Sequence, residues 1–410
     1  MTPAGGKPVR VGVFGLLGSG NLGNDGSLEA VLGRLRAACP EAVVDALCGG
    51  PETVTARYGV PATRLHWYRG EYRTASRAGA VAGKGLGKLV DAVRTAAWVR
   101  RHDVVVVPGM GVLEATLPLR PWGFPYALFL LCASGRLLRT PVALVGVGAG
   151  PIADRPTRAL VRWSARLAAY RSYRDELSRD ALRAMGVDTA GDAVHPDLAF
   201  ALPAPAVPAE RPAGPPGPVC VGVMDFHGGN DDRARAEEIH RRYLDGTTRF
   251  VRALAAEGRR VRLLTGDACD ARVVDAILDA VDSPLVTASG AASLAELMEE
   301  AAAADAVVAT RYHNLVCALR AGTPTLALSY AAKSDALMAG MGLGAYRHPA
   351  REVDADRLME QFRELEKDAA GLRRTLAERN RSAARRLEAH LAALTAFLFP
   401  HTLPTPREAP

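Results

Sequence analysis

Short runs of apolar residues alternate along this chain with longer segments in which apolar residues recur at helical spacing. The apolar runs predict strands at 9–15, 42–48, 103–109, 141–148, 169–175, 219–226, 260–266, 284–289, 305–310 and 324–330. The intervening segments predict helices at 27–38, 122–138, 157–169, 232–256, 270–281, 293–302 and 313–321. Uniformly apolar strands separated by helices are typical of a parallel sheet covered on both faces. The pattern therefore predicts an α/β protein with two Rossmann-like, doubly wound domains.

The alternation is interrupted at 203–218, where seven of sixteen residues are proline. Proline fits neither a central strand nor a helix interior, so this segment predicts an extended linker. We expect an N-terminal domain at 1–202 and a C-terminal domain at 219–350. The Arg- and Glu-rich residues 351–400 predict a helical segment that returns to brace the first domain, and 401–410 predict a disordered tail.

Two such domains are expected to face each other across a cleft, because ligands of doubly wound sheets bind beyond the carboxyl ends of the strands. The residues that follow the strands are mostly glycines, polar side chains and cations. They are Gly18, Asn21, Gly23, Asn24, Asp25, Gly109, Gly111, Glu114, Arg174, Asp225, Arg311, His313, Tyr330 and Lys333. Glycine-lined turns and helix N-termini bind oxyanions, and Arg and Lys neutralise them. These residues predict an anionic, phosphate-bearing ligand.

The stretch GSGNLG beginning at Gly18 has the G-x-G-x-x-G form of a dinucleotide-binding loop. In such a loop the first glycine follows the strand directly, whereas two leucines separate Gly18 from the preceding strand. The polar residues Asn21, Asn24 and Asp25 lie where a pyrophosphate would need bare backbone. We therefore favour a substrate-binding loop, while a nicotinamide site and a turn without a ligand stay open as alternatives.

His313 is the principal candidate for acid–base chemistry. It lies two positions after Arg311, at the start of a predicted helix. The helix dipole disfavours an imidazolium there and a nearby phosphate favours it, so this side chain could exchange a proton near neutrality. Lys333 would share the anion site and Arg174 would contribute from the first domain. The alternatives are a histidine that caps its own helix, a solvated lysine, and an arginine paired with the adjacent acids.

Composition limits the class of function. Hydrophobic residues make up 49% of the 410 residues, and the formal net charge is +7. The basic residues are scattered and only 6% of residues are aromatic, which argues against a nucleic-acid partner and suits small anionic substrates. The six cysteines form no C-x-x-C pair and the nine histidines lack zinc-site spacing. We expect free thiols and no metal.

The sequence also bears on location and assembly. The first residues lack an apolar signal core, and the most apolar run, at 126–133, is too short to cross a bilayer. We expect a cytoplasmic protein without a transmembrane segment. A peripheral position at the inner face of the membrane and homo-oligomerisation both stay open.

Six motifs together resemble the polysaccharide pyruvyl transferase family over residues 10–345. They are GNLGNDGSLEAVL, VVPGMGVLEA, VGVGAGPI, SYRDELSRDALRAMGV, HPDLAFAL and ATRYHNLVCALRAGTPTLALSYAAKSDALMAGMGL. The resemblance implies a fold like that of GT-B glycosyltransferases. It also implies transfer of the enolpyruvyl group of phosphoenolpyruvate to hydroxyls of a sugar or lipid-linked glycan, giving a pyruvate ketal without a metal or redox cofactor.

The resemblance also implies roles for individual residues. Arg311 and His313 fall on the family's phosphoenolpyruvate-binding and acid–base block, Tyr330 and Lys333 on its tyrosine–lysine element, and Arg174 on its R-D-E element. The base that activates the acceptor hydroxyl is left among Asp25, Glu114 and Asp225.

Two loops depart from the family pattern. The common G-N-x-G-D-E-A loop reads GNLGNDG here, and the G-G-G turn reads PGMG around Gly109 and Gly111. Both loops are expected to face the acceptor, so the acceptor sugar is not defined by the resemblance. A nucleotide-sugar glycosyltransferase and a non-catalytic binding protein of the same fold are the alternatives.

Overall fold

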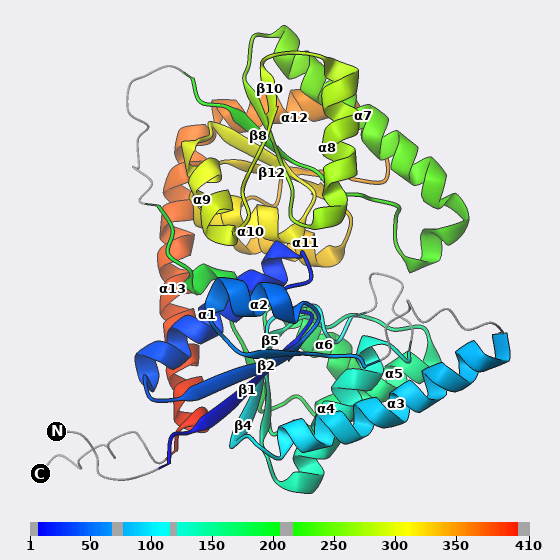
Figure 1. Ribbon diagram of the computed structural model, residues 1–410. Helices are drawn as coiled ribbons and strands as arrows, with labels where there is room; N and C mark the ends of the chain where they lie inside the picture. Colours follow the sequence, from blue (N-terminus) through cyan, green and yellow to red (C-terminus); the bar gives the residue numbers. More distant parts are fainter. Residues whose placement is uncertain (1–6, 68–76, 115–120, 206–215, 401–410) are drawn as a thin grey trace, which may run out of the picture. The chain divides into compact units, whose positions relative to one another are not determined.

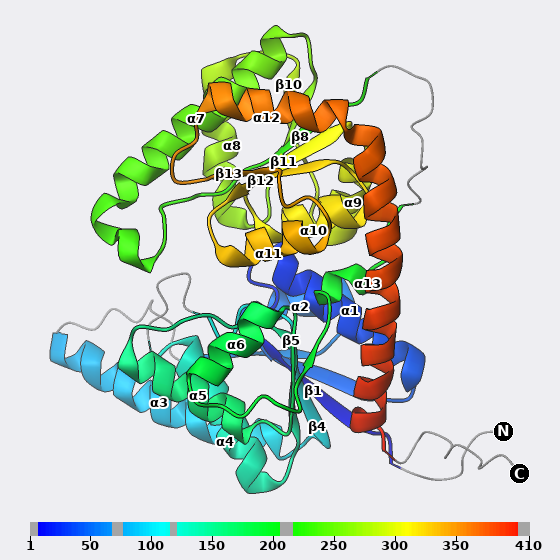
Figure 2. The same ribbon diagram turned by 180° about the vertical axis from the view of Figure 1, so that it is seen from behind.

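The structure is a computed structural model that describes residues 7–67, 77–114, 121–205 and 216–400 (Figures 1 and 2). The chain forms two compact units, which we call unit 1 and unit 2. Unit 1 consists of Met1–Ser19, Ser27–Leu198 and Arg386–Pro410, and unit 2 consists of Gly20–Gly26 and Ala199–Arg385. The expected bounds of 1–202 and 219–350 differ from this division in three places, because unit 2 includes Gly20–Gly26, begins again at Ala199 and extends to Arg385. The expected tail at 401–410 and most of the linker lie outside the described residues.

Unit 1 contains a seven-stranded parallel sheet with the order β3-β2-β1-β4-β5-β6-β7. Its strands are β1 (Arg10–Gly15), β2 (Val43–Cys48), β3 (Ala62–Arg64), β4 (Val104–Pro108), β5 (Val142–Val147), β6 (Tyr170–Tyr173) and β7 (Ala193–Val194). Every residue of β4 and β5 is buried, as expected for apolar strands with helices on both faces. The strand order reverses direction between β1 and β4, so the carboxyl ends of these two strands mark the expected ligand position in this unit.

The helices of unit 1 connect these strands. They are α1 (Leu22–Ala38, which begins in unit 2), α2 (Pro51–Tyr58), α3 (Arg77–Val99), α4 (Phe124–Leu138), α5 (Arg155–Leu167) and α6 (Glu176–Ala184). Helices α5 and α6 have conventional N-caps, because the carboxylates of Asp154 and Asp175 accept hydrogen bonds from the N–H groups of Thr157 and Ser178. Asp175 directly follows Arg174, so this cap also fixes the backbone beside a candidate site residue.

Unit 2 contains a six-stranded parallel sheet with the order β10-β9-β8-β11-β12-β13. Its strands are β8 (Val219–Gly222), β9 (Val261–Leu264), β10 (Val286–Ala288), β11 (Ala306–Ala309), β12 (Thr325–Ser329) and β13 (Arg347–Pro349). Its helices are α7 (Ala236–Ala256), α8 (Ala271–Val281), α9 (Leu294–Ala303), α10 (Tyr312–Arg320), α11 (Ala332–Gly340) and α12 (Ala355–Lys367). The order again reverses at the first and fourth strands, β8 and β11, which pair in parallel.

The predicted fold class is confirmed, and all ten predicted strands are present. The structure adds β3, β7 and β13, which lie at the edges of their sheets and contain two or three residues each. An edge strand pairs on one side only and is not fully covered, so it needs no long apolar run. Sequence analysis also missed α3, because its glycines at 83, 85 and 87 weaken the helical signal.

The C-terminal segment forms two helices and not one. Helix α12 ends at Lys367, and α13 runs from Ala369 to Leu398. The last part of α13 belongs to unit 1, where His390 stacks on His195 with ring centroids 3.5 Å apart. In the same unit, Arg34 of α1 donates to Glu388 at 2.9 Å. The C-terminal end of this segment therefore packs on residues of unit 1.

The stacked histidines predict a loss of stability in acid. Burial lowers the pKa of His195 to about 4 and that of His390 to about 3, with Arg386 and the neighbouring imidazole acting in the same direction. Because both values lie below that of an unfolded histidine, the unfolded chain binds more protons once the pH falls below about 6.5. The stability is fully present above that pH. It should fall by roughly 1.4 kcal/mol per histidine for each pH unit between about 6.5 and the folded-state pKa of that histidine, and no further below it.

The test is urea denaturation of the full chain at about pH 7.5 and about pH 5. The variant His390→Phe keeps an aromatic ring but removes one titrating group, so it should show a smaller acid shift of the midpoint than the unaltered chain. An equal shift in both proteins would contradict this assignment.

Candidate active site

The residues that join β11 to α10 form the centre of the candidate site in unit 2. Strand β11 ends at Ala309, and Arg311 is the N-cap residue of α10. The Arg311 guanidinium lies against Asp270, which is fully buried. Its Nε donates to Asp270 Oδ2 at 2.9 Å and its Nη2 donates to Oδ1 at 2.6 Å. This bidentate pair fixes the plane of the guanidinium at the carboxyl end of β11.

Asp270 organises the backbone around Arg311. Its carboxylate accepts hydrogen bonds from the N–H groups of Asp225, Gly266 and Asp267 at 2.9, 3.2 and 3.0 Å. Burial alone would lower the pKa of Arg311, but the hydrogen bonds and charge of Asp270 outweigh it, and the net shift is upward. Arg311 is therefore a permanent cation, and the three hydrogen bonds it donates to Asp270 and Cys269 engage three of its five N–H donors.

We expect Asp270→Ala to lower the free energy of unfolding of the full chain by about 3–5 kcal/mol, because it leaves a buried guanidinium without its counter-charge. The exposed Asp275 on α8 provides the matched control, and Asp275→Ala should change stability by less than about 0.5 kcal/mol. Chemical denaturation measures both. Equal midpoints for the two variants would show that the Arg311 pair does not stabilise unit 2.

His313 and Lys333 both lie beside the ring of Tyr312. The rings of Tyr312 and His313 meet edge to face with centroids 5.3 Å apart. The Lys333 ammonium lies 5.9 Å from the centroid of Tyr312 and 5.8 Å from that of Tyr330. Since Lys333 begins α11 after β12, the two neighbouring strands β11 and β12 bring these side chains together. The structure thus assembles His313, Tyr330 and Lys333 at one edge of the sheet.

The loop at residues 20–26 contacts this same site within unit 2. The side-chain N–H of Asn21 donates to Asp267 at 2.9 Å, and the N–H of Leu22 donates to the carbonyl of Gly266 at 3.0 Å. A Cβ atom at Gly23 would lie only 1.9 Å from Nδ1 of His313. Gly23 is therefore required to make room for the imidazole. The backbone of the loop and the candidate acid–base residue are in direct contact.

Further residues of this loop, and Gly18 just before it, are also fixed by contacts within the protein. The Asn21 side chain accepts from the N–H of Asn24 at 3.1 Å, at the start of α1. Asp25 is 4% exposed and lies in the first helical turn. Gly18 has φ +68°, and a Cβ there would lie 2.3 Å from the carbonyl oxygen of Gly50. The first and last glycines of the G-x-G-x-x-G stretch thus accommodate protein atoms, which argues against a dinucleotide loop.

The candidate residues of unit 1 gather around Arg174. Its guanidinium lies 3.5 Å from Glu114, 3.7 Å from Asp175 and 3.7 Å from Asp197, and its side chain is 3% exposed. A Cβ at Gly111 would lie 2.0 Å from the Glu114 carboxylate. The turn around Gly109 and Gly111 and the end of β6 therefore bring Glu114 and Arg174 together. Three nearby carboxylates more than offset the single positive charge of Arg174, so its role toward an anion stays a prediction.

Glycine is required at position 109 for a different reason. Gly109 has φ +53°, and a Cβ there would lie 2.3 Å from the Ser27 hydroxyl of α1. Only glycine adopts this conformation readily and leaves space for Ser27. Gly109 thus packs the turn after β4 against α1 in unit 1.

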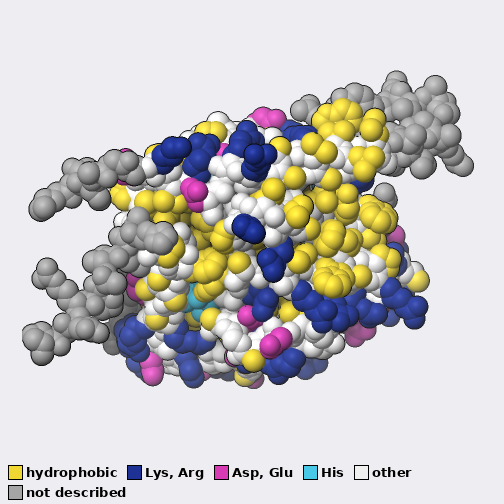
Figure 3. Space-filling model, turned by 90° about the horizontal axis from the view of Figure 1, so that it is seen from below, with side chains coloured by type: hydrophobic (Ala, Val, Ile, Leu, Met, Phe, Trp, Pro, Cys, Tyr) yellow, Lys and Arg dark blue, Asp and Glu magenta, His cyan; other side chains and the backbone are white. Residues whose placement is uncertain are grey.

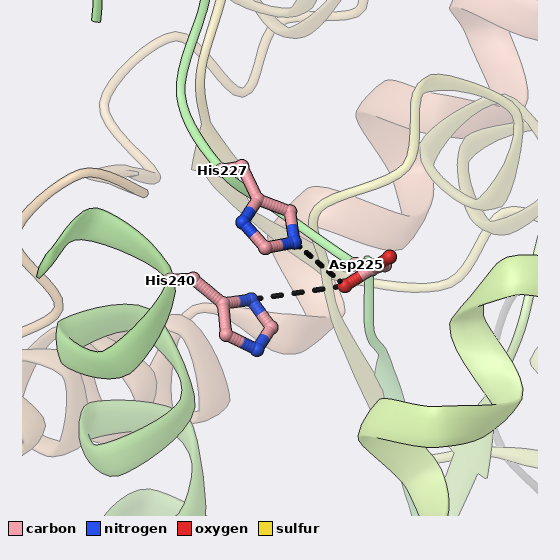
Figure 4. A group of neighbouring side chains, drawn as sticks. All are labelled: Asp225, His227 and His240. Carbon is pink, nitrogen blue, oxygen red and sulfur yellow. Dashed lines mark hydrogen bonds and ion pairs between the residues drawn. The ribbon is translucent and has the colours of Figure 1, made fainter. Parts of the chain in front are cut away.

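Asp225, His227 and His240 form a cluster that sequence spacing did not reveal (Figure 4). Asp225 Oδ1 lies 3.1 Å from Nε2 of His227 and 3.7 Å from Nδ1 of His240, and the two rings are stacked at 4.3 Å. Arg272 pairs with the other carboxylate oxygen. Among the residues the structure describes, these three could hold a divalent cation. The Arg272 guanidinium already supplies a positive charge there, and the expectation that no metal is needed stays a prediction.

Sequence analysis did not identify Asp270, and it gave no role to Asn314. Asp270 follows β9 in the stretch TGDACD, and acids directly after a strand were the available signal. Asn314 is 1% exposed and lies between Gly222 and Gly266, whose Cβ positions would be 2.7 and 2.9 Å from its amide. Glycine at those two positions makes room for the Asn314 side chain beneath His313. Its importance depends on packing between three segments, which no local pattern reports.

Comparison with known proteins assigns the chain to a family. Residues 21–331 match the polysaccharide pyruvyl transferase family. The chain belongs to this family. The match includes the loop at Asn21, the turn around Gly109, Arg174 and the segment from Arg311 to Ala331, and it ends two residues before Lys333. It establishes that the protein is a transferase of a family that acts on polysaccharides. No curated protein is significantly similar to the chain over its sequence.

Several solved structures have the same fold as this chain, among them the following three. A putative UDP-N-acetylglucosamine 2-epimerase from Listeria monocytogenes is 13% identical, with a TM-score of 0.61 over 97% of this chain and 98% of the other. The UDP-GlcNAc 2-epimerase from Neisseria meningitidis, bound to UDP-GlcNAc, is 11% identical, with a TM-score of 0.59 over 94% and 99%. MurG from Acinetobacter baumannii is 14% identical, with a TM-score of 0.52 over 94% and 100%. At these identities the pyruvyl transferase shares a GT-B-like fold with them and nothing more specific.

Within the described residues, the pyruvyl transferase has no helix that is both long enough and apolar enough to cross a bilayer.

Proposed function

We propose that this pyruvyl transferase moves the enolpyruvyl group of phosphoenolpyruvate onto sugar hydroxyls of a glycan and forms a pyruvate ketal. The observation that carries the proposal is the shared contact at Tyr312, whose ring lies beside both the His313 imidazole and the Lys333 ammonium. We take His313 as the proton donor and Lys333 as a cation, both beside this ring at the carboxyl edge of the sheet in unit 2. Phosphoenolpyruvate requires both.

The charges of the site suit this donor. Phosphoenolpyruvate carries a carboxylate and a phosphate, and such groups are bound by Arg and Lys. Arg311 is held in a fixed plane by Asp270, and Lys333 is oriented over two rings. The first residues of α10 and α11 also present backbone N–H groups that attract anions. Asp270 offsets part of the charge of Arg311, so Lys333 is expected to contribute much of the attraction to the phosphate.

The proposed reaction assigns His313 the role of general acid. Its imidazolium gives a proton to the methylene carbon of the donor, which turns that carbon into a methyl group and leaves an oxocarbenium-like centre. A sugar hydroxyl attacks this centre and loses its proton to a base, for which Asp25, Glu114 and Asp225 are the candidates. Loss of inorganic phosphate and attack by a second hydroxyl then close the ketal. The products are the ketal and phosphate.

The experiment that tests the proposal supplies the purified chain with isotopically labelled phosphoenolpyruvate and glycans extracted from cells that lack this protein. The expected result is release of inorganic phosphate and a glycan mass gain equal to pyruvate minus water. Incubation with nucleotide sugars serves as the comparison. Release of a nucleoside diphosphate, with no use of phosphoenolpyruvate, would refute the proposal and favour a glycosyltransferase.

We expect Lys333→Ala to raise the apparent KM for phosphoenolpyruvate by roughly tenfold to a hundredfold, because a hydrogen bond between charged groups contributes about 1.5–3 kcal/mol. The exposed Lys367 at the end of α12 is the matched control, and Lys367→Ala should leave KM unchanged. Steady-state phosphate release measures both. An unchanged KM in the Lys333 variant would remove this residue from the anion site.

A further inference from the structure

The middle turns of helix α3 place apolar side chains in solvent and polar ones in the interior, whereas its last turn buries Trp98 and Val99 as an ordinary surface helix does. Its buried positions include Asp91 and Thr95, which are 4% and 3% exposed. Its outward positions are Leu86, Leu89 and Val93, which are 57%, 66% and 71% exposed. These three residues are spaced three and four positions apart and so share one side of the helix. An apolar stripe on the solvent side of a helix indicates that something other than water covers it.

The exposed apolar surface continues onto the next two helices of unit 1. Helix α3 packs against α4, and α4 packs against α5. On α4, Tyr126, Leu130, Ala133 and Leu137 share one side, and Leu137 is 82% exposed. Trp122 precedes α4 and is 63% exposed, and Trp163 of α5 is 51% exposed. We call the solvent side of α3, α4 and α5 the α3–α5 face; Figure 3 shows hydrophobic side chains gathered among Lys and Arg.

The α3–α5 face is strongly basic. From residue 85 of α3 to the end of α5, the three helices carry seven basic residues, Lys88, Arg94, Arg136, Arg155, Arg158, Arg162 and Arg166. They carry one acidic residue, the buried Asp91, which pairs with Lys88 and Arg94 at 3.7 and 3.8 Å, and the exposed Asp154 directly precedes α5. The whole chain has a formal charge of only +7, so this small part of it holds most of the excess.

Cations also lie directly beside the aromatic rings of this face. The Lys88 ammonium is 5.6 Å from the centroid of Tyr126, and the Arg166 guanidinium is 5.6 Å from that of Trp163. The ring of Tyr126 in turn contacts that of Trp122 at 5.8 Å. Tryptophan and tyrosine beside Arg and Lys are typical of the boundary between lipid headgroups and acyl chains.

We propose that the α3–α5 face binds the surface of an anionic lipid bilayer, with Leu86, Leu89 and Val93 entering the headgroup region. Each part of the face matches this occupant. Transfer of the exposed aliphatic side chains from water into the bilayer lowers the free energy of the system. Tryptophan side chains are favoured at the boundary between headgroups and acyl chains, and the arginines attract anionic headgroups. Membrane binding by this face brings the transferase to the surface where lipid-linked glycans are held. The inference rests on unit 1 alone and does not depend on the donor.

Two other occupants fit less well. A second copy of the chain would pair this face with itself in a two-fold dimer, and the two sets of seven basic residues would repel each other. A nucleic acid would match the charge, but exposed leucine and valine side chains contribute nothing to binding phosphates. A lipid surface is the occupant that uses both the apolar and the basic residues.

The experiment is sedimentation of the full chain with vesicles of phosphatidylcholine alone or mixed with phosphatidylglycerol. Binding is expected to the anionic vesicles, to weaken at high salt, and to be much weaker on neutral vesicles. The pair Arg155→Gln and Arg158→Gln should lower the partition coefficient roughly fivefold for each charge removed. Leu89→Gln should lower it by roughly tenfold, because a buried leucine is lost.

Matched control variants test whether vesicle binding depends on the α3–α5 face or on the total charge and hydrophobicity of the chain. Arg242→Gln and Arg249→Gln remove two exposed arginines from α7 in unit 2, and Leu177→Gln removes an exposed leucine from α6. These variants should bind vesicles like the unaltered chain. Thermal unfolding and phosphate release should be unchanged in all of them, since none lies in the candidate site.

Three results would overturn the proposal. They are failure of the unaltered chain to bind anionic vesicles, an equal loss of binding in the control variants, and a dimer in solution that Leu89→Gln dissociates. The last would assign the α3–α5 face to a second copy of the chain.

Discussion

His313→Ala should lower the turnover of pyruvyl transfer by about 10²–10⁴-fold, the usual contribution of a positioned general acid. The imidazole begins α10, lies edge to face with Tyr312, and has the backbone of Gly23 directly beside it. Its position is therefore fixed by protein contacts, as proton transfer to a specific carbon atom requires. The expected loss is in kcat, measured by phosphate release at saturating phosphoenolpyruvate.

Two further measurements separate acid–base chemistry from structural support. The folded state of the variant is checked by its thermal unfolding, which should be close to that of the unaltered chain. Added imidazole should restore part of the activity to His313→Ala, because it can supply the missing proton. Near-normal turnover in the variant, or a loss that appears only in KM, would contradict the assignment of His313 as the acid.

Gly23→Ala should reduce turnover by at least about a hundredfold, although it adds a single methyl group far from His313 in sequence. The new Cβ would lie 1.9 Å from Nδ1 of His313, so the imidazole must leave its position. The imidazole is the end of a movable side chain, so the loss of stability should be small in comparison. The measurement is kcat by phosphate release together with thermal unfolding.

The same helix provides a matched control. Gly33 also lies in α1, but a Cβ there meets no atom within 4 Å. Gly33→Ala should retain full activity and gain up to about 1 kcal/mol of stability from helix propensity. The double variant Gly23→Ala with His313→Ala should be no less active than His313→Ala alone, since both changes act through the same imidazole. Additive losses would show that Gly23 acts in some other way.

Much of the fold could be predicted because the relevant signals are local. Four consecutive valines at 104–107 and the run VALVGV at 142–147 are short, apolar and rich in β-branched residues, which favours a strand buried on both faces. Edge strands such as β13, with the sequence RHP, carry no such signal. Helix α3 has 23 residues, but the glycines near its start weaken the helical pattern in the sequence. Packing on α4 stabilises this helix.

The candidate site was predicted in part for the same reason. Arg311, His313, Tyr330 and Lys333 follow neighbouring strands, and parallel strands place their carboxyl ends at one edge. Asp270 was missed because it follows β9 and reaches Arg311 only through the folded sheet. The cluster of Asp225, His227 and His240 was missed because the end of β8 and the first turns of α7 must fold together to form it.

The sequence by itself determined the two doubly wound units, the family, and the segments after the strands that supply the candidate residues. All three can be recognised from hydrophobic periodicity and short motifs, because both are properties of residues close together in the sequence. Only the tertiary structure decided that Gly20–Gly26 belongs with the second unit and that Gly23 makes room for His313. It also decided that α3 turns leucines outward. The physical reason is that close packing between distant segments depends on atoms that no local pattern brings together.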